Sequence, residues 1–102
     1  MKQIKQIVED IREELDGAEH YAKLSMKYKE TEKELSEMYA ELASQELVHV
    51  NRLHGKAVDL IKAAQAKGME IPTGMQAVYD WEHERMIERK AKIKTILDMY
   101  QK

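Results

Sequence analysis

The sequence predicts an all-α fold of three long helices that form a single domain over residues 1–102. Apolar residues recur three and four positions apart along most of the chain, which is the spacing of one helical face. No stretch has the strict alternation of a strand. Turn signals are confined to residues 28–31 and 67–74, and the second stretch holds the only proline and two of the four glycines. These two breaks divide the chain into three helical segments.

Helices are expected over about residues 3–29, 32–67 and 74–101. Thr31-x-x-Glu34 has the spacing of a capping box, in which both side chains bond free amides at the start of a helix. Gly68 suits the left-handed position that ends a helix. Thr73-x-x-Gln76 repeats the capping-box spacing before the third helix. The first two helices should form an antiparallel hairpin.

Composition excludes several classes of protein. Hydrophobic residues make up 43% and charged residues 35%, which is too apolar for a disordered chain and too charged for a membrane span. Without cysteine there are no disulfides or thiolate ligands, so any metal must bind to carboxylate oxygen and imidazole nitrogen. A formal charge of -2 gives no general attraction to nucleic acid or to a membrane. The first residues lack the apolar run of a signal peptide, so we expect a cytoplasmic protein.

Polar residues interrupt the apolar stripes that the first two helices are expected to bury. The stripe of the first helix comprises Ile4, Ile7, Ile11, Glu14, Ala18, Tyr21, Ser25 and Tyr28. The stripe of the second comprises Leu35, Met38, Leu42, Glu46, His49, Leu53, Ala57 and Leu60. A buried charge is costly unless it is paired, hydrogen-bonded or bound to a metal. Glu14, Glu46 and His49 are therefore the candidate metal ligands.

The register of the hairpin brings these three residues to one level. If the chain turns near residue 31, Glu14 lies 17 positions before the turn, and Glu46 and His49 lie 15 and 18 positions after it. A di-iron site in a four-helix bundle needs a Glu from each of two helices and Glu-x-x-His from each of the other two. Two copies of this hairpin provide that set. We therefore expect a homodimer or a higher even-numbered homo-oligomer.

A second polar group lies on the third helix, around Glu82, His83 and Glu84. If this helix folds back on the hairpin, the level opposite Glu46 falls near residues 91–94, so the two polar groups do not meet. The three residues are second-rank candidates for an accessory ion or a contact with another subunit.

Two motifs resemble those of a known family. Glu14 stands seven residues before Tyr21, and Glu46 and His49 form Glu-x-x-His. These patterns resemble the first two helices of the rubrerythrin-like branch of the ferritin-like superfamily, over about residues 8–62. The stretch Ala-x-Gln-Glu-x-x-His-x-x-Arg-Leu is its most specific part. A second half-site within the chain is absent, so the sequence is similar to the encapsulated ferritins, whose ferroxidase centre forms between two subunits.

The resemblance implies a di-iron carboxylate protein that oxidises Fe(II) with dioxygen or peroxide, a ferroxidase-type oxidoreductase. It implies that Glu46 bridges or chelates, that Glu14 and His49 are terminal ligands, and that Tyr21 bonds a ligand or donates an electron. Such ligands suit iron or manganese, and zinc or calcium can occupy them in vitro. The alternative is a non-catalytic helical oligomerisation or interaction module, with a structural metal or none.

Overall fold

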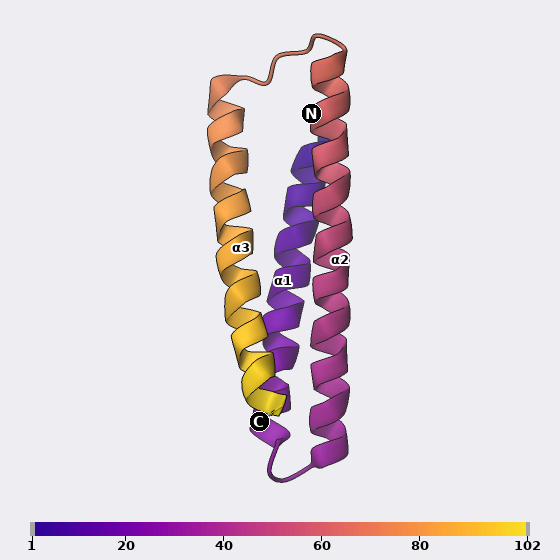
Figure 1. Cartoon of the computed structure of the whole chain (residues 1–102), viewed down its shortest axis with the longest axis vertical. Helices are drawn as coiled ribbons and strands as arrows, with labels where there is room; N and C mark the ends of the chain where they lie inside the picture. The colour runs from indigo at the N-terminus through magenta and orange to yellow at the C-terminus, as the bar shows by residue number, and fades with distance from the viewer. Residues whose placement is uncertain (1, 102) are drawn as a thin grey trace.

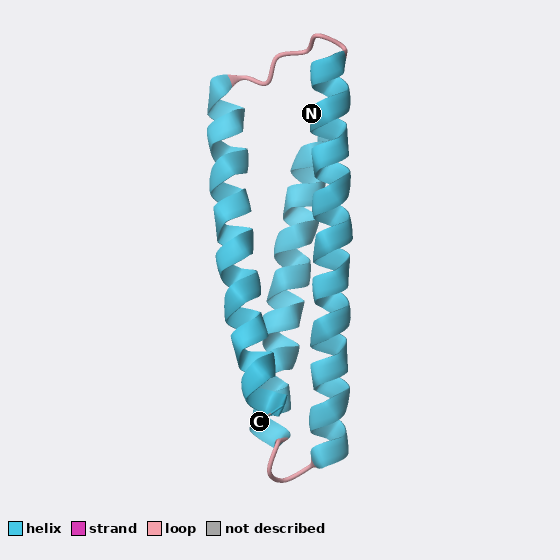
Figure 2. Cartoon of the chain, viewed as in Figure 1, coloured by secondary structure: helices cyan, strands magenta, loops and turns pink. Residues whose placement is uncertain are grey.

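The computed structural model describes residues 2–101 of the chain and contains three helices (Figure 1). They are α1 (Lys2–Tyr28), α2 (Lys33–Ala66) and α3 (Thr73–Gln101). The prediction of an all-α fold with three helices is confirmed, and loops occupy only the two connections (Figure 2). The helices α1 and α2 form an antiparallel hairpin, and α3 returns alongside, parallel to α1. The molecule is a rod of 56 × 18 × 18 Å.

The start of α2 differs from the predicted capping box. The helix begins at Lys33, and Glu32 occupies the N-cap position without a side-chain cap. The amides of Thr31 and Glu32 both donate to the carbonyl of Tyr28, which tightens the turn and leaves Thr31 outside the helix. The predicted capping pair of Thr31 and Glu34 is therefore wrong, because the turn uses one more residue than expected.

The connection between α2 and α3 bears out one prediction and corrects another. Gly68 has φ of 79°, so it adopts the left-handed conformation expected of a residue that ends a helix. The third helix already begins at Thr73, where the carbonyl of Pro72 accepts from the amide of Gln76. The Gln76 side chain donates to Asp80 at 2.9 Å instead of returning to the helix start. The second predicted capping box is wrong for this reason.

The core is a narrow seam between α1 and α2 that α3 closes on one side. Its buried members are Ile11, Leu15, Ala18, Ala22, Ala43, Leu47, Val50, Met86 and Ile93. The alanines let the two helices of the hairpin approach closely. Near the turn, Ser36 Oγ donates to the carbonyl of Ser25 at 2.5 Å, and Ser25 Oγ donates to that of Ala22 at 2.9 Å. Both buried hydroxyls therefore have partners, as buried polar groups require.

The buried row of α2 coincides with the predicted stripe only at Ala57. Ala43, Leu47 and Val50 are buried, whereas Met38 and His49 are exposed and Glu46 is half-buried. The helix carries two apolar rows one residue apart, and the row of smaller residues packs against α1. The other row, with its Glu and His, borders the open side of the hairpin. On α1 the predicted stripe is buried at Ile4, Ile11, Ala18 and Ser25, and only Leu15 and Ala22 are buried one residue away from it.

Charged side chains attach α3 to α1. We call them the α1–α3 polar ladder: Arg12 with Glu82 at 2.5 Å, Arg89 with Asp16 at 2.7 Å, and Lys92 with Glu19 at 3.1 Å. Just after α1, Lys29 Nζ also donates to the carbonyl of Met99 at 3.0 Å. Helix α3 packs mainly against α1 and barely touches α2. The hairpin is therefore the structural unit, and α3 covers one of its faces.

The chain exposes more surface than a compact monomer of its mass. Its accessible surface is 7111 Å², whereas folded monomers of this mass expose about 6,000 Å². Its radius of gyration is 16.4 Å, against about 13 Å for a compact domain of this length. The exposed apolar side chains include Met38 on α2 and Trp81 on α3. Among the described helices, none is both long and apolar enough to cross a membrane.

Candidate metal centre

Glu14, Glu46 and His49 lie together at mid-height of the hairpin. Each offers a ligand atom, and these three atoms all lie within 4.8 Å of one another. The Nδ1 atom of His49 is 3.4 Å from Oε2 of Glu14. Because α1 and α2 run antiparallel about a turn near residue 31, residues whose numbers sum to about 60 face each other. The structure thus brings together all three first-rank candidates.

The cluster faces away from α3. Successive residues are about 100° apart around a helix, so Glu14 lies about 200° from Arg12, which pairs with α3. By the same rule His49 lies about 140° from His54, which stacks on α3. The side chain of His49 is 50% exposed and that of Glu14 is 29% exposed. Both line a broad open hollow of about 700 Å³. This side of the hairpin is accessible to a second molecule.

The two carboxyl groups of the cluster lie close enough for Glu14 to raise the pKa of Glu46. A hydrogen bond with Glu14 raises the pKa of Glu46, and burial and the negative charge of Glu14 raise it further. The positive charge of His49 acts in the opposite direction on that pKa. Two carboxylates held this closely repel each other when both are ionised, so a proton or a cation must lie between them.

Gly17 provides the space that Glu46 occupies. A Cβ atom at this position would lie 3.4 Å from Oε2 of Glu46 and 3.8 Å from its Cδ. Any side chain at position 17 would therefore contact the carboxyl group. The contact is of ordinary van der Waals length, and a Cβ at Gly55 would meet nothing within 4 Å.

Tyr21 lies next to the cluster along α1 but is not part of it. It is seven residues from Glu14, about 10 Å along the helix axis. Its ring stacks on that of Tyr39 with centroids 5.9 Å apart, and Tyr39 stacks on Tyr28 at 6.2 Å. Tyr39 was missed by the sequence analysis, although the hairpin register that pairs Glu14 with Glu46 also pairs Tyr21 with Tyr39.

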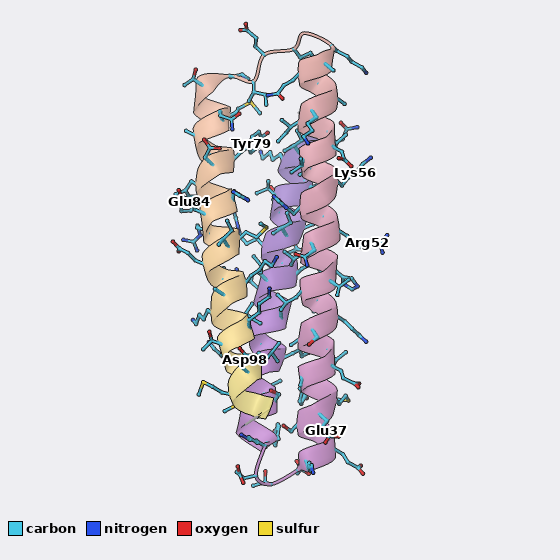
Figure 3. The ribbon with its side chains drawn as sticks, in the orientation of Figure 1. Glu37, Arg52, Lys56, Tyr79, Glu84 and Asp98 are labelled. Carbon is cyan, nitrogen blue, oxygen red and sulfur yellow. The ribbon has the colours of Figure 1, made fainter. Side chains whose placement is uncertain are left out.

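The second-rank candidates lie elsewhere. Glu82 pairs with Arg12, and the ring of His83 stacks on His54 with centroids 5.0 Å apart. Glu84 is exposed and points away from the hairpin (Figure 3). The structure does not bring these residues to the Glu14 cluster, because they lie on α3 and the cluster faces away from that helix. His54 and Tyr79, which face α3 and the hairpin, were not singled out by the sequence pattern.

The chain is therefore a three-helix protein that carries a cluster of two carboxyl groups and one imidazole on the open side of its hairpin. No family model, curated protein or solved structure matches this chain. The assignment of a function must therefore come from the cluster itself.

Proposed function

We propose that two copies of this chain join their hairpins into a four-helix bundle and form a di-iron carboxylate centre between them. In this proposal Glu14, Glu46 and His49 of both copies hold the ions, as in the ferritin-like superfamily that the sequence resembles. Ferrous ions held there would be oxidised by dioxygen or peroxide, which makes the protein a ferroxidase-type oxidoreductase.

The proposal rests on one observation: three ligand atoms lie within 4.8 Å of one another on a face that the chain itself leaves uncovered. One chain supplies two carboxylates and one imidazole, which is half of the ligand set of a di-iron site. Doubling this set requires a second copy on the same face. The large accessible surface, 7111 Å², supports such an association because a chain this thin buries little by itself.

The donor types support iron or manganese. Carboxylate oxygens with one imidazole nitrogen per ion suit these metals better than copper, although zinc or calcium can also bind to such a set. The raised pKa of Glu46 favours its protonated form, and metal binding would displace that proton, since a carboxylate must be ionised to act as a ligand. The cluster should therefore bind metal more weakly as the pH falls.

Anaerobic iron loading tests the proposal. Metal-free protein receives two ferrous ions per dimer and is then exposed to air, while absorbance and oxygen uptake are recorded. We expect an oxo-ferric absorbance, oxygen consumption and an even-numbered oligomer in solution. Glu46→Gln should lose most of the iron binding. Glu37→Gln, which removes an exposed carboxylate from the same helix, is the matched control and should bind normally (Figure 3). Equal binding by both variants would contradict the assignment.

A second candidate is a helical interaction module without redox chemistry. The observation that favours it is the hydrogen bond between Glu14 and Glu46, together with the 3.4 Å contact to His49, because these groups satisfy one another without an ion. For this function, the purified protein would be an oligomer that binds no iron, or binds it without oxidation in air. The iron-loading experiment therefore separates the two functions.

A further inference from the structure

A groove lies between the three helices, on the side of the hairpin away from the candidate metal centre. It has a volume of about 380 Å³, within the range of small-molecule sites. Its apolar wall is formed by Ile4, Val8, Ile11, Ala57, Val58 and Ile61. The groove exists because α3 starts well away from α2 and approaches the hairpin mainly along α1 (Figure 1).

Tyr79 supplies a polar atom that lacks a partner. It extends from α3 toward the hairpin and lines the groove (Figure 3). Its hydroxyl oxygen is buried and has no hydrogen-bond partner within the described part of the chain. Buried polar groups are nearly always paired, so an unpaired one in a groove indicates a missing partner. That partner must donate to, or accept from, a phenol.

The charge of the groove indicates which ligand it favours. Neither lysine nor arginine is among the lining residues, whereas Asp80 and Glu82 are. Glu82 is already paired with Arg12 at 2.5 Å. Asp80 is exposed and accepts only from the neutral amide of Gln76 at 2.9 Å, which leaves its negative charge without a cationic partner among the described residues.

His54, which also lines the groove, offers little positive charge to offset these carboxylates. His54 and His83 stack with their centroids 5.0 Å apart. Burial lowers the pKa of His54, and the positive charges of His83 and Lys90 lower it further. A neutral imidazole adds no attraction for an anion. The polar rim is therefore acidic above an apolar wall.

We propose that this groove binds a small organic ammonium ion with an apolar body. The body would lie against the isoleucine and valine side chains. The ammonium group would donate to the Tyr79 hydroxyl oxygen and lie in the field of the Asp80 carboxylate. This site is separate from the candidate metal centre, and its existence does not depend on iron binding.

Three probes with one shape and different charges test this proposal. They are 1-naphthylmethylamine, 1-naphthylmethanol and 1-naphthoate, titrated into the purified oligomer by calorimetry at neutral pH. The amine should bind about fivefold more tightly than the alcohol, which corresponds to a partly exposed ion pair. The carboxylate should bind most weakly of the three. If the carboxylate equals or exceeds the amine, or if none of the three binds, the proposal is wrong.

Two substitutions localise the binding. Tyr79→Phe removes the hydroxyl and keeps the ring, and Asp80→Asn removes the charge. Each should weaken amine binding about fivefold, and Asp80→Asn should also abolish the preference for amine over alcohol. Asp98→Asn, at an exposed position on the same helix, is the matched control and should bind like the unchanged protein (Figure 3).

The melting temperature and the oligomer mass of each variant show whether a change in binding comes from the groove or from a damaged fold. Tyr79→Phe removes an unpaired buried hydroxyl, so its melting temperature should equal or exceed that of the unchanged protein. Amine binding that is the same in both groove variants as in the control would overturn the proposal. A change in oligomer mass in Tyr79→Phe would overturn it too, because the groove would then be an interface filled by another copy.

Discussion

Replacement of Gly17 by alanine separates the stability of the hairpin from metal binding at its candidate centre. Alanine in a helix interior is more stable than glycine by about 0.5–1 kcal/mol, because glycine loses more backbone freedom on folding. The added Cβ would lie 3.4 Å from Oε2 of Glu46, an ordinary contact distance, so no clash offsets the gain. For a domain of this size the gain corresponds to a melting temperature about 2–8 °C higher.

The same methyl group should impair the metal site. It fills the space beside the Glu46 carboxyl group, which must lose its proton and turn toward an ion. Changes next to a ligand commonly reduce metal affinity by about tenfold or more. Gly17→Ala should therefore be more stable as the apoprotein and bind iron more weakly.

Gly55→Ala provides the matched control. A Cβ at Gly55 meets nothing within 4 Å, so this variant should gain similar stability and keep its iron affinity. Thermal unfolding of the metal-free proteins at one fixed concentration, and iron titration of each, give the two readouts. A lower melting temperature for Gly17→Ala alone would refute the reasoning, because it would mean that another chain occupies this space. Unchanged iron affinity would show that Glu46 does not move through it.

Three further outcomes are expected. Folding raises the pKa of Glu46, so protonation of this group stabilises the folded apoprotein fully below the ordinary pKa of 4.5, and the stabilisation is lost as pH rises through the raised pKa. In denaturant titrations the free energy of unfolding should fall with pH across this range, and Glu46→Gln should remove that dependence. Folding lowers the pKa of His54, so the neutral imidazole contributes to stability fully above pH 6.5, and this contribution is lost as pH falls below that value. His54→Asn should reduce the dependence of the free energy of unfolding on pH in this range, and an unchanged pH profile would contradict the burial of the ring. Ile93→Ala removes the most buried side chain of α3 and should cost about 2–5 kcal/mol, measured by urea unfolding; a cost below 1 kcal/mol would mean that α3 is not docked as described.

The helices were predictable because their signals are local. Apolar spacing and two clusters of turn residues determined every helix boundary to within one residue. The details of the helix starts were not predictable, because Thr31 satisfies the pattern of a cap but lies in a turn that uses it differently. A capping motif indicates which hydrogen bonds can form at the start of a helix, and the length of the preceding turn determines which of them do form.

The sequence pattern also did not predict which face of α2 is buried. Both Leu47 and Leu42 stand in apolar rows of α2, and only the packing of alanine-rich surfaces selects the row that contacts α1. The level of the cluster was predictable, because counting from the turn places Glu14 opposite Glu46 whichever row is buried. The groove beside Tyr79 was not, since it depends on the distance between α2 and α3.

The fastening of α3 has a consequence for how the molecule responds to its medium. The α1–α3 polar ladder lies at the surface, where dissolved salt screens attraction between charges, whereas the hairpin seam is apolar and is not weakened in this way. High ionic strength should therefore weaken the polar part of the attachment of α3, while the apolar contacts of Met86 and Ile93 and the hairpin seam are kept. The two sides of the rod would then differ in their sensitivity to electrolytes, with the covering helix the first part of the fold to yield.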